Sequence, residues 1–393
     1  MTPAELSRVV LGAVRRAVAA EELRGAVPDS VVVRRPPRPG CGDYATNVAL
    51  QIAGSAGRTP YAVAEILARR LEKEPGIAQV EIAGRGFLNI TLSAGAYGDV
   101  VRQVRAQREQ YGRGDGLADE AVVVVAAEPG SLRGEIAAEV VNRLLEAAGA
   151  QPAAPGTRTE ALSVQEPADP ADPADPGGPA GPADPADPGT PNTPAAPLGP
   201  DATRWALLRP PAQDIPRLTT DLLDQRESNP LFRVRYARAR ALALVRNAHD
   251  LGVAIDTPVD TPADTAIDTA GETGAEDAEG PHESAQAAEG ATDREPDRAT
   301  YHHPAETELL GLVADFPRVV ETAARRRAPD RVARHLERLA DAFFRFHDEC
   351  PPLPKGDEKP SAAHGARIRL TDATGVVLTG GLDLLGISAP DHM

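Results

Sequence analysis

The sequence predicts an α+β N-terminal domain and an all-α C-terminal helix bundle, joined by a long disordered linker. Strand and helix patterns alternate within residues 1–150, whereas only helical patterns follow residue 201. Between them, the run EPADPADPADPGGPAGPADPADPGTPNTPAAPLGP over 166–200 contains no aromatic residue and a proline at about every third position. Because prolines lack amide donors and the run lacks large apolar side chains, it is expected to form neither helix, sheet nor core.

The N-terminal domain is predicted over residues 1–112. Apolar side chains recur at helical spacing from Leu6 to Ala17, and Thr59 and Pro60 supply the cap and first residue of a later helix. Two β-branched runs separated by a Gly turn predict neighbouring strands. In chain order, the expected elements are a helix over 6–17, a strand over 31–35, helices over 45–53 and 60–74, strands over 80–84 and 86–92, and a helix over 94–111.

Residues 113–150 have the pattern of a single β-α unit. AVVVVAA over 121–127 is a continuous apolar strand of the kind that is buried on both faces. Gly130 and Ser131 form the turn, and a helix is expected from Arg133 to Ala148. In a doubly wound fold a nucleotide phosphate would bind at such a turn, but one β-α unit is not a sheet. The disordered linker is expected directly afterwards, over 151–200.

The C-terminal helix bundle is predicted in two pieces, 201–252 and 301–393, which flank a disordered acidic insert over 253–300. The last three expected helices carry an apolar stripe, and short proline-containing loops connect them. The helices are expected over 216–224, 230–251, 306–327, 331–349 and 363–385.

The net charge of −16 belongs to the two tracts that are expected to be disordered. Residues 160–200 contain 7 acidic and no basic residues, and 253–300 contain 13 acidic residues and 2 Arg. These segments contribute −18, which leaves 40 basic and 38 acidic residues elsewhere. The acidic composition therefore says little about what the folded parts bind.

The two cysteines, Cys41 and Cys350, lie far apart in sequence and offer neither a disulfide framework nor metal-ligand spacing. The N-terminus lacks the apolar region of a signal peptide, and the longest apolar run is too short to span a bilayer. The sequence predicts a cytoplasmic protein that uses no metal and no cofactor.

Three separated stretches resemble the arginyl-tRNA synthetase family, in the order in which family members carry them. The first comprises GCGDYATNVAL (40–50) and GRGFLNITLS (84–93), which are similar to signatures of the family's additional N-terminal domain. The second, NPLFRVRYARARAL (229–242), resembles NPVYYVQYAHAR at the start of the DALR-type anticodon-binding bundle. The third comprises LADAFFRFHDEC (339–350) and the C-terminal stretch 367–393.

The resemblance also implies which family features this chain lacks. Residues 121–149 look like the first strand and helix of the family's catalytic Rossmann domain, but Glu128–Gly134 replaces the run that carries two ATP-site histidines. DATRWALLR (201–209) resembles the segment that follows the KMSKS-type loop in the family. We therefore interpret residues 113–150 as a remnant of the catalytic domain, and expect that the chain is not an enzyme.

The resemblance implies one tRNA contact in the N-terminal domain. Phe87 and Asn89 match the aromatic and amide residues with which the family meets a base of the D-loop. An aromatic ring can stack on a splayed base, and an amide can hydrogen-bond to its edge. The alternative for Phe87 is a core aromatic side chain.

A second contact is implied in the helix bundle. Tyr236 and Arg240 match the family's Y-A-x-A-R, which contributes to the anticodon-loop contact. Phe346 and Met393 match further family positions, although core packing explains the phenylalanine equally well.

Arginines also crowd two of the predicted bundle helices, and arginine pairs with phosphates and stacks on bases. Solvated helix faces are the alternative interpretation. The positions expected to form basic patches for the tRNA backbone are Arg235, Arg238, Arg327, Arg331 and Arg334.

Three functional hypotheses follow. The first is a catalytically defective relative that binds tRNA, with tRNA(Arg) as the expected ligand. The second is a protein-interaction paralogue that has lost RNA binding and pairs with a full-length synthetase. The third is a subunit of an arginine–tRNA ligase that needs a separate catalytic chain. Salt-sensitive binding of tRNA separates the first from the second.

Overall fold

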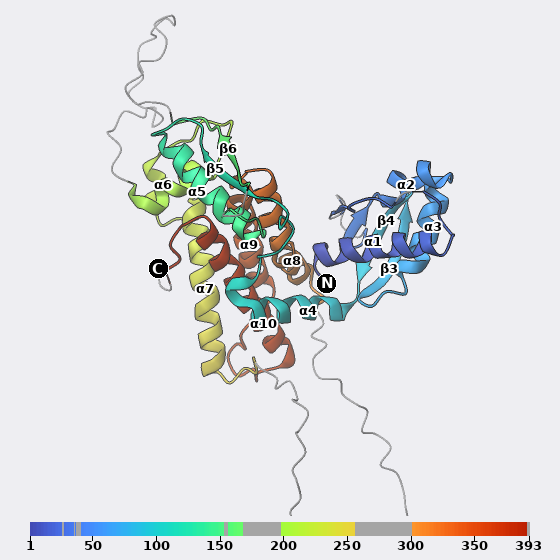
Figure 1. Ribbon diagram of the computed structural model, residues 1–393. Coiled ribbons are helices and arrows are strands. Elements are labelled where there is room, and N and C mark those ends of the chain that lie inside the picture. The colour runs from blue at the N-terminus through green and yellow to red at the C-terminus, as the bar shows by residue number, and fades with distance from the viewer. Residues whose placement is uncertain are drawn as a thin grey trace, which may run out of the picture.

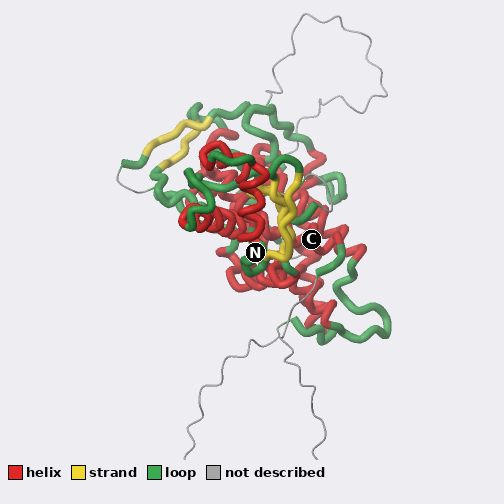
Figure 2. Tube along the Cα trace, turned by 90° about the vertical axis from the view of Figure 1, so that its right-hand side faces the viewer, coloured by secondary structure: helices red, strands yellow, loops and turns green. Residues whose placement is uncertain are grey.

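The computed structural model describes residues 1–25, 27–34, 36, 41–152, 156–167, 198–255 and 301–390. Figure 1 shows a small N-terminal domain beside a larger, mainly helical body, with helix α4 (Ala94–Gln107) running from one into the other. Figure 2 shows that the strands form two separate groups among the helices. Most of the expected linker and insert, and Met393, lie outside the described residues.

The N-terminal domain contains a four-stranded antiparallel sheet in the order β1-β2-β4-β3. Its strands are β1 (Val33–Arg34), β2 (Tyr44–Thr46), β3 (Ile77–Ala83) and β4 (Phe87–Leu92). Its helices are α1 (Pro3–Ala19), α2 (Val48–Ala56) and α3 (Pro60–Leu71). Along β4, Leu88, Ile90 and Leu92 are buried and the alternate residues are not, so one face of the sheet packs on the core and the other stays open.

Local sequence signals explain where two of these helices begin. The Thr2 side chain accepts a hydrogen bond from the Glu5 amide at 3.3 Å, and Glu5 accepts one from the Thr2 amide at 2.8 Å, which forms a capping box for α1. Thr59 caps α3 by accepting from the Ala62 amide at 3.3 Å, as the sequence predicted.

The next unit is larger than the predicted single strand and helix. Strand β5 (Val122–Ala126) and helix α5 (Leu132–Ala147) are followed by β6 (Arg158–Leu162), which pairs with β5 in parallel. The predicted linker boundary at residue 151 is therefore wrong for the described residues 156–167. The Arg-Thr-Glu-Ala-Leu sequence of β6 is short and mostly polar, so its apolar pattern gives no strand signal.

The prediction that β5 is buried on both faces is also wrong, because Val125 is 41% exposed. Among the described strands β6 is the one that pairs with β5, and at the other edge of β5 the Asn142 side chain of helix α5 bonds to the strand backbone. The Val124 amide donates to Asn142 Oδ1 at 2.8 Å, and Asn142 Nδ2 donates to the Val124 carbonyl at 2.8 Å. This side-chain amide satisfies the strand edge as a neighbouring strand would.

The C-terminal part is a helix bundle, as predicted. It contains one helix that was not expected, and one expected helix is absent from the described residues. Residues 199–208 form the additional helix, whereas 216–224 form only a short 3₁₀ turn, η2 (Thr220–Leu223). Ile215 and Leu223 are exposed, and Leu218 and Leu222 are only partly buried against the core. This segment therefore buries too little apolar surface to stabilise a short helix. The bundle helices are α6 (Gly199–Leu208), α7 (Pro230–Asp250), α8 (Pro304–Arg325), α9 (Asp330–Glu349) and α10 (Ala362–Leu384).

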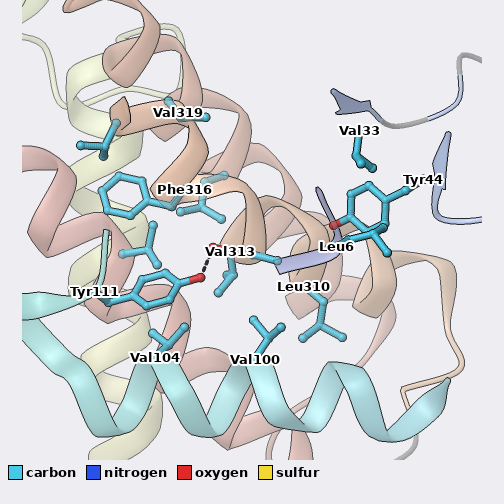
Figure 3. Close-up of a cluster of buried hydrophobic side chains, with 14 of the residues drawn as sticks. Leu6, Val33, Tyr44, Val100, Val104, Tyr111, Leu310, Val313, Phe316 and Val319 are labelled. Atoms are coloured by element: carbon cyan, nitrogen blue, oxygen red, sulfur yellow. Dashed lines mark hydrogen bonds between the residues drawn. The ribbon is translucent and has the colours of Figure 1, made fainter. Parts of the chain in front are cut away.

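Helix α4 and the 3₁₀ turn η1 (Arg108–Gln110) fix the N-terminal domain to the bundle. Figure 3 shows Val100 and Val104 of α4 facing Val313 of α8, in one buried cluster with Tyr111. The Tyr111 hydroxyl donates to the Val313 carbonyl at 3.0 Å, and burial raises the pKa of this phenol. The two domains are thus packed directly against each other, in addition to being connected by the chain.

Ion pairs support the same junction. Arg105 Nε and Arg108 Nη1 lie 2.8 and 2.9 Å from the two carboxylate oxygens of Asp372 on α10. Gly112 adopts φ +98°, and a Cβ atom there would lie 2.5 Å from the Phe316 ring. The close approach of backbone and ring explains why a glycine occupies this position.

Candidate nucleic-acid interface

The open face of the N-terminal sheet carries both residues that the sequence analysis assigned to a D-loop contact. Phe87 is 47% exposed, so the interpretation as a core aromatic is wrong. Asn89 lies two residues further along β4 on the same face. The strand register places Asn89 between Ala45 of β2 and Glu81 of β3, and Arg34 of β1 lies opposite Ala45.

A cavity of about 570 Å³ lies on this face. Most of the surface that it exposes is apolar, although about half of its lining residues are polar. An apolar hollow with polar groups in its lining is typical of ligand sites. The lining residues are Val32, Arg34, Pro36, Cys41, Ala45, Thr46, Asn47, Gln51, Ala83, Phe87 and Asn89. An aromatic ring beside amides in an apolar hollow suits an unstacked nucleobase.

A stack of aromatic rings lies between α7 and α9 in the bundle. Tyr236, which is 42% exposed, stacks on Phe232 with ring centroids 5.6 Å apart and on Phe344 with centroids 5.7 Å apart. The guanidinium carbon of Arg233 lies 5.4 Å from the centroid of the Phe344 ring. Parallel rings with an exposed member and a cation provide a surface on which bases can stack.

Arg240 is exposed on α7 and lies one helical turn beyond Tyr236. Its Nη2 is 3.4 Å from His347 Nε2 on α9, so the structure brings both predicted α7 residues to the aromatic face. Phe346 is completely buried, which contradicts its assignment to the anticodon loop, because a core side chain cannot contact RNA in the folded bundle. The α9 aromatic beside Tyr236 is Phe344, and Met393 lies outside the described residues.

Arg235 and Arg238 do not form a basic patch. Arg235 pairs with Asp201 and donates to the Ser388 carbonyl at 3.1 Å. Arg238 is 8% exposed and donates to Thr379 Oγ1 at 2.8 Å and to the Pro390 carbonyl at 2.7 Å. Both side chains are occupied in holding the C-terminal segment against the bundle.

Arg327 is likewise occupied by the protein itself. Its Nη2 atom lies 2.9 Å from Glu160 of β6 and 3.5 Å from Glu120, and its side chain is 11% exposed. Arg331 is exposed on α9, and Arg334 is about half exposed with Asp330 3.5 Å away. Of the five predicted patch residues, these last two therefore lie at the surface.

Sequence reasoning missed the role of Arg133, which is 1% exposed on α5. Its five N–H donors meet five backbone carbonyls, and desolvation lowers the pKa of the guanidinium. The Nε–H donates to Leu207 at 3.0 Å, and the remaining donors reach Gln165, Asp214, Pro210 and Pro211. Arg133 thereby joins α5, the residues after β6 and the segment after α6.

Within the described ranges, no group of three or more His, Cys, Asp or Glu side chains could hold a metal ion. A search of the same residues finds no helix with the length and apolar character needed to cross a membrane.

Two protein-family models match this chain. The model "Arginyl tRNA synthetase N terminal domain" matches residues 5–92, and the model "DALR anticodon binding domain" matches 282–393. Curated arginine–tRNA ligases align along the whole chain as well. This chain is an arginyl-tRNA synthetase-like protein.

The relatives with whole-length alignments include the arginine–tRNA ligases of Frankia alni, at 29% identity, and Pseudarthrobacter chlorophenolicus, at 26%. Both alignments cover 100% of this chain and of the relative. A third, from Clavibacter sepedonicus, is 36% identical over 50% of this chain and 29% of the relative. The expectation that the chain is not an enzyme is wrong on this comparison, because the full-length relatives carry the name of a ligase.

Solved structures show the same fold. The arginyl-tRNA synthetase of Thermus thermophilus matches with a TM-score of 0.59 at 14% identity, over 100% of both chains. The enzyme of Plasmodium falciparum matches with a TM-score of 0.57 at 8% identity, over 100% of this chain and 99% of its own. The Frankia alignment runs over 588 positions, whereas this chain has 393 residues, so about a third of its positions have no counterpart here.

Proposed function

We propose that this arginyl-tRNA synthetase-like protein binds tRNA, with tRNA(Arg) as its ligand, through two surfaces. The exposure of Phe87 carries the proposal. A phenylalanine that is 47% exposed beside an amide on an open sheet face contributes little to the core. The same arrangement is well suited to a splayed base.

The aromatic face of α7 and α9 supplies the second surface. Tyr236 and Arg240 of α7 lie there beside Phe344 and His347 of α9. The matched anticodon-binding family model covers residues 282–393, which include α9 but not α7. Stacking on such rings is worth about 1–3 kcal/mol per base. Two surfaces on domains that pack directly against each other can contact one RNA without ordering a linker first.

The test is binding of labelled tRNA(Arg) transcript to the full chain at several salt concentrations, with a non-cognate tRNA in parallel. We expect a dissociation constant in the low-micromolar range or below that rises steeply with salt. Tyr61→Ala is the matched control for Phe87→Ala, since Tyr61 is an exposed aromatic residue on α3 of the same N-terminal domain. Absence of salt-sensitive binding would favour the protein-interaction hypothesis, in which a full-length synthetase is the partner.

We also propose that tRNA binding serves arginine–tRNA ligation, because relatives aligned over their whole length are named for that activity. Charging of tRNA(Arg) with labelled arginine should be measured with the chain alone and with fractions of its native cell added. Charging by the chain alone would identify a complete ligase. Charging that requires a second chain would identify a tRNA-binding subunit, and no charging in either case would refute this second proposal.

A further inference from the structure

Besides Asn89, two more amide side chains line the cavity on the N-terminal sheet, those of Asn47 and Gln51. Asn47 is the N-cap residue of α2, a position where Asn normally accepts a hydrogen bond from the first turn. Here its side chain makes no capping bond. Thr46 Oγ1 instead accepts from the Val48 amide at 3.3 Å. The Asn47 amide is therefore not used to stabilise its own helix.

The strand register explains why this amide and the one on Asn89 line one hollow. Thr46 pairs with Leu88 and Ala45 pairs with Asn89, so the end of β2 runs directly beside the start of β4. Ala45 has a small side chain and fills little of the space next to Asn89. Asn47 follows Thr46 immediately in the chain and Phe87 precedes Leu88, and both line the same cavity.

Among the residues that the structure describes, the cavity lining contains one cationic side chain, Arg34. Arg34 is exposed on the edge strand β1 and lies opposite Ala45 in the register. The row Arg34, Ala45, Asn89 thus crosses the sheet from a charged edge to the amide. An unstacked nucleotide presents an aromatic face, a donor and acceptor edge, and a negative phosphate, and the cavity offers a partner for each.

We infer that Asn47 is a second base-reading residue, which together with Asn89 hydrogen-bonds the edge of a tRNA base stacked on Phe87, while Arg34 pairs with the phosphate of that nucleotide. The inference rests on the proposed tRNA binding. Each amide supplies donors and an acceptor, so two of them can address two positions of one base edge. Bidentate contacts of this kind discriminate between bases.

The test compares full-chain variants on fluorescent, unmodified tRNA(Arg) transcripts, one intact and a series with a single abasic D-loop nucleotide. Asn47→Ser keeps a residue that suits an N-cap and removes the amide, so the fold is retained. We expect Asn47→Ser to bind the intact transcript about tenfold more weakly than the wild type does. On the one abasic transcript that lacks the base read by Asn47, the variant and the wild type should bind equally. Gln79→Ala, an exposed amide on β3 outside the cavity lining, is the matched control and should change little.

Arg34→Gln should weaken binding of every transcript and reduce the salt dependence by about one phosphate contact. The assignment of Asn47 would be overturned if Asn47→Ser bound the intact transcript as tightly as Gln79→Ala does. It would also be overturned if Asn47→Ser lost the same affinity on every abasic transcript. A wild-type chain that binds no tRNA would refute the proposed function itself. Loss of binding in Phe87→Ala without any loss in Asn47→Ser would refute this inference alone.

Discussion

Replacing Arg133 tests the claim that one buried side chain joins three segments of the chain. In Arg133→Met, five backbone carbonyls lose their donor. Each typical hydrogen bond contributes about 1 kcal/mol net, and an unsatisfied buried acceptor costs about 1–3 kcal/mol. Water molecules that enter the site can hydrogen-bond some of these carbonyls and reduce the cost. We therefore expect a loss of about 4–5 kcal/mol in the free energy of unfolding. Arg133→Lys keeps the charge but has three donors, and should lose about 2–3 kcal/mol.

The assay is urea unfolding followed by tryptophan fluorescence. The sequence contains one tryptophan, Trp205, which is 1% exposed on α6, the helix whose Leu207 carbonyl accepts from Arg133. Arg143→Met is the control, because Arg143 lies on α5, as Arg133 does, and its side chain is 42% exposed in its pair with Glu139. Its loss should stay below about 1 kcal/mol. If both Arg133 variants unfold at the same urea concentration as Arg143→Met, the reasoning fails.

Three further predictions concern the bundle and its junction. Burial lowers the pKa of His335 to about 4. The free energy of unfolding should therefore be highest above pH 6.5 and fall by up to about 3 kcal/mol between pH 6.5 and 4. His335→Gln should flatten that fall in urea titrations, and an unchanged pH profile would contradict this. Gly112→Ala should lower the free energy of unfolding by about 2–3 kcal/mol, since φ is +98° and the new Cβ would meet a ring at 2.5 Å. Both this variant and the control Gly114→Ala, whose new Cβ would meet no atom within 4 Å, should be compared in urea unfolding. Arg240→Gln should reduce the salt dependence of tRNA binding by about one contact at unchanged melting temperature. Arg238→Gln should lower the melting temperature instead, and the opposite pattern would refute their assignments.

Periodicity predicted the long elements because their apolar faces are regular. The same apolar spacing also indicates that two predicted site residues, Arg238 and Phe346, face the core. In α7 the buried residues Leu231, Val234, Arg238 and Ala241 recur at spacings of three and four, so Arg238 belongs to the core-facing stripe. The same spacing fixes which phenylalanines of α9 are buried.

On α9 the buried stripe runs through Leu336, Leu339, Phe343 and Phe346, and Phe344 falls outside it. This spacing distinguishes the buried Phe346 from the aromatic that meets Tyr236. The contacts of Arg133 could not be predicted in this way, because they depend on three segments that are distant in sequence and meet only in the folded chain.

We expect one tRNA to engage both the sheet face of the N-terminal domain and the aromatic face of the bundle. The most direct measurement is the dissociation constant of tRNA(Arg) for the wild type, Phe87→Ala, Tyr236→Ala and the double variant, at one salt concentration. We expect each single change to weaken binding about tenfold and the double change to weaken it more than either single change. Unchanged affinity in both single variants, with Tyr61→Ala as reference, would contradict it.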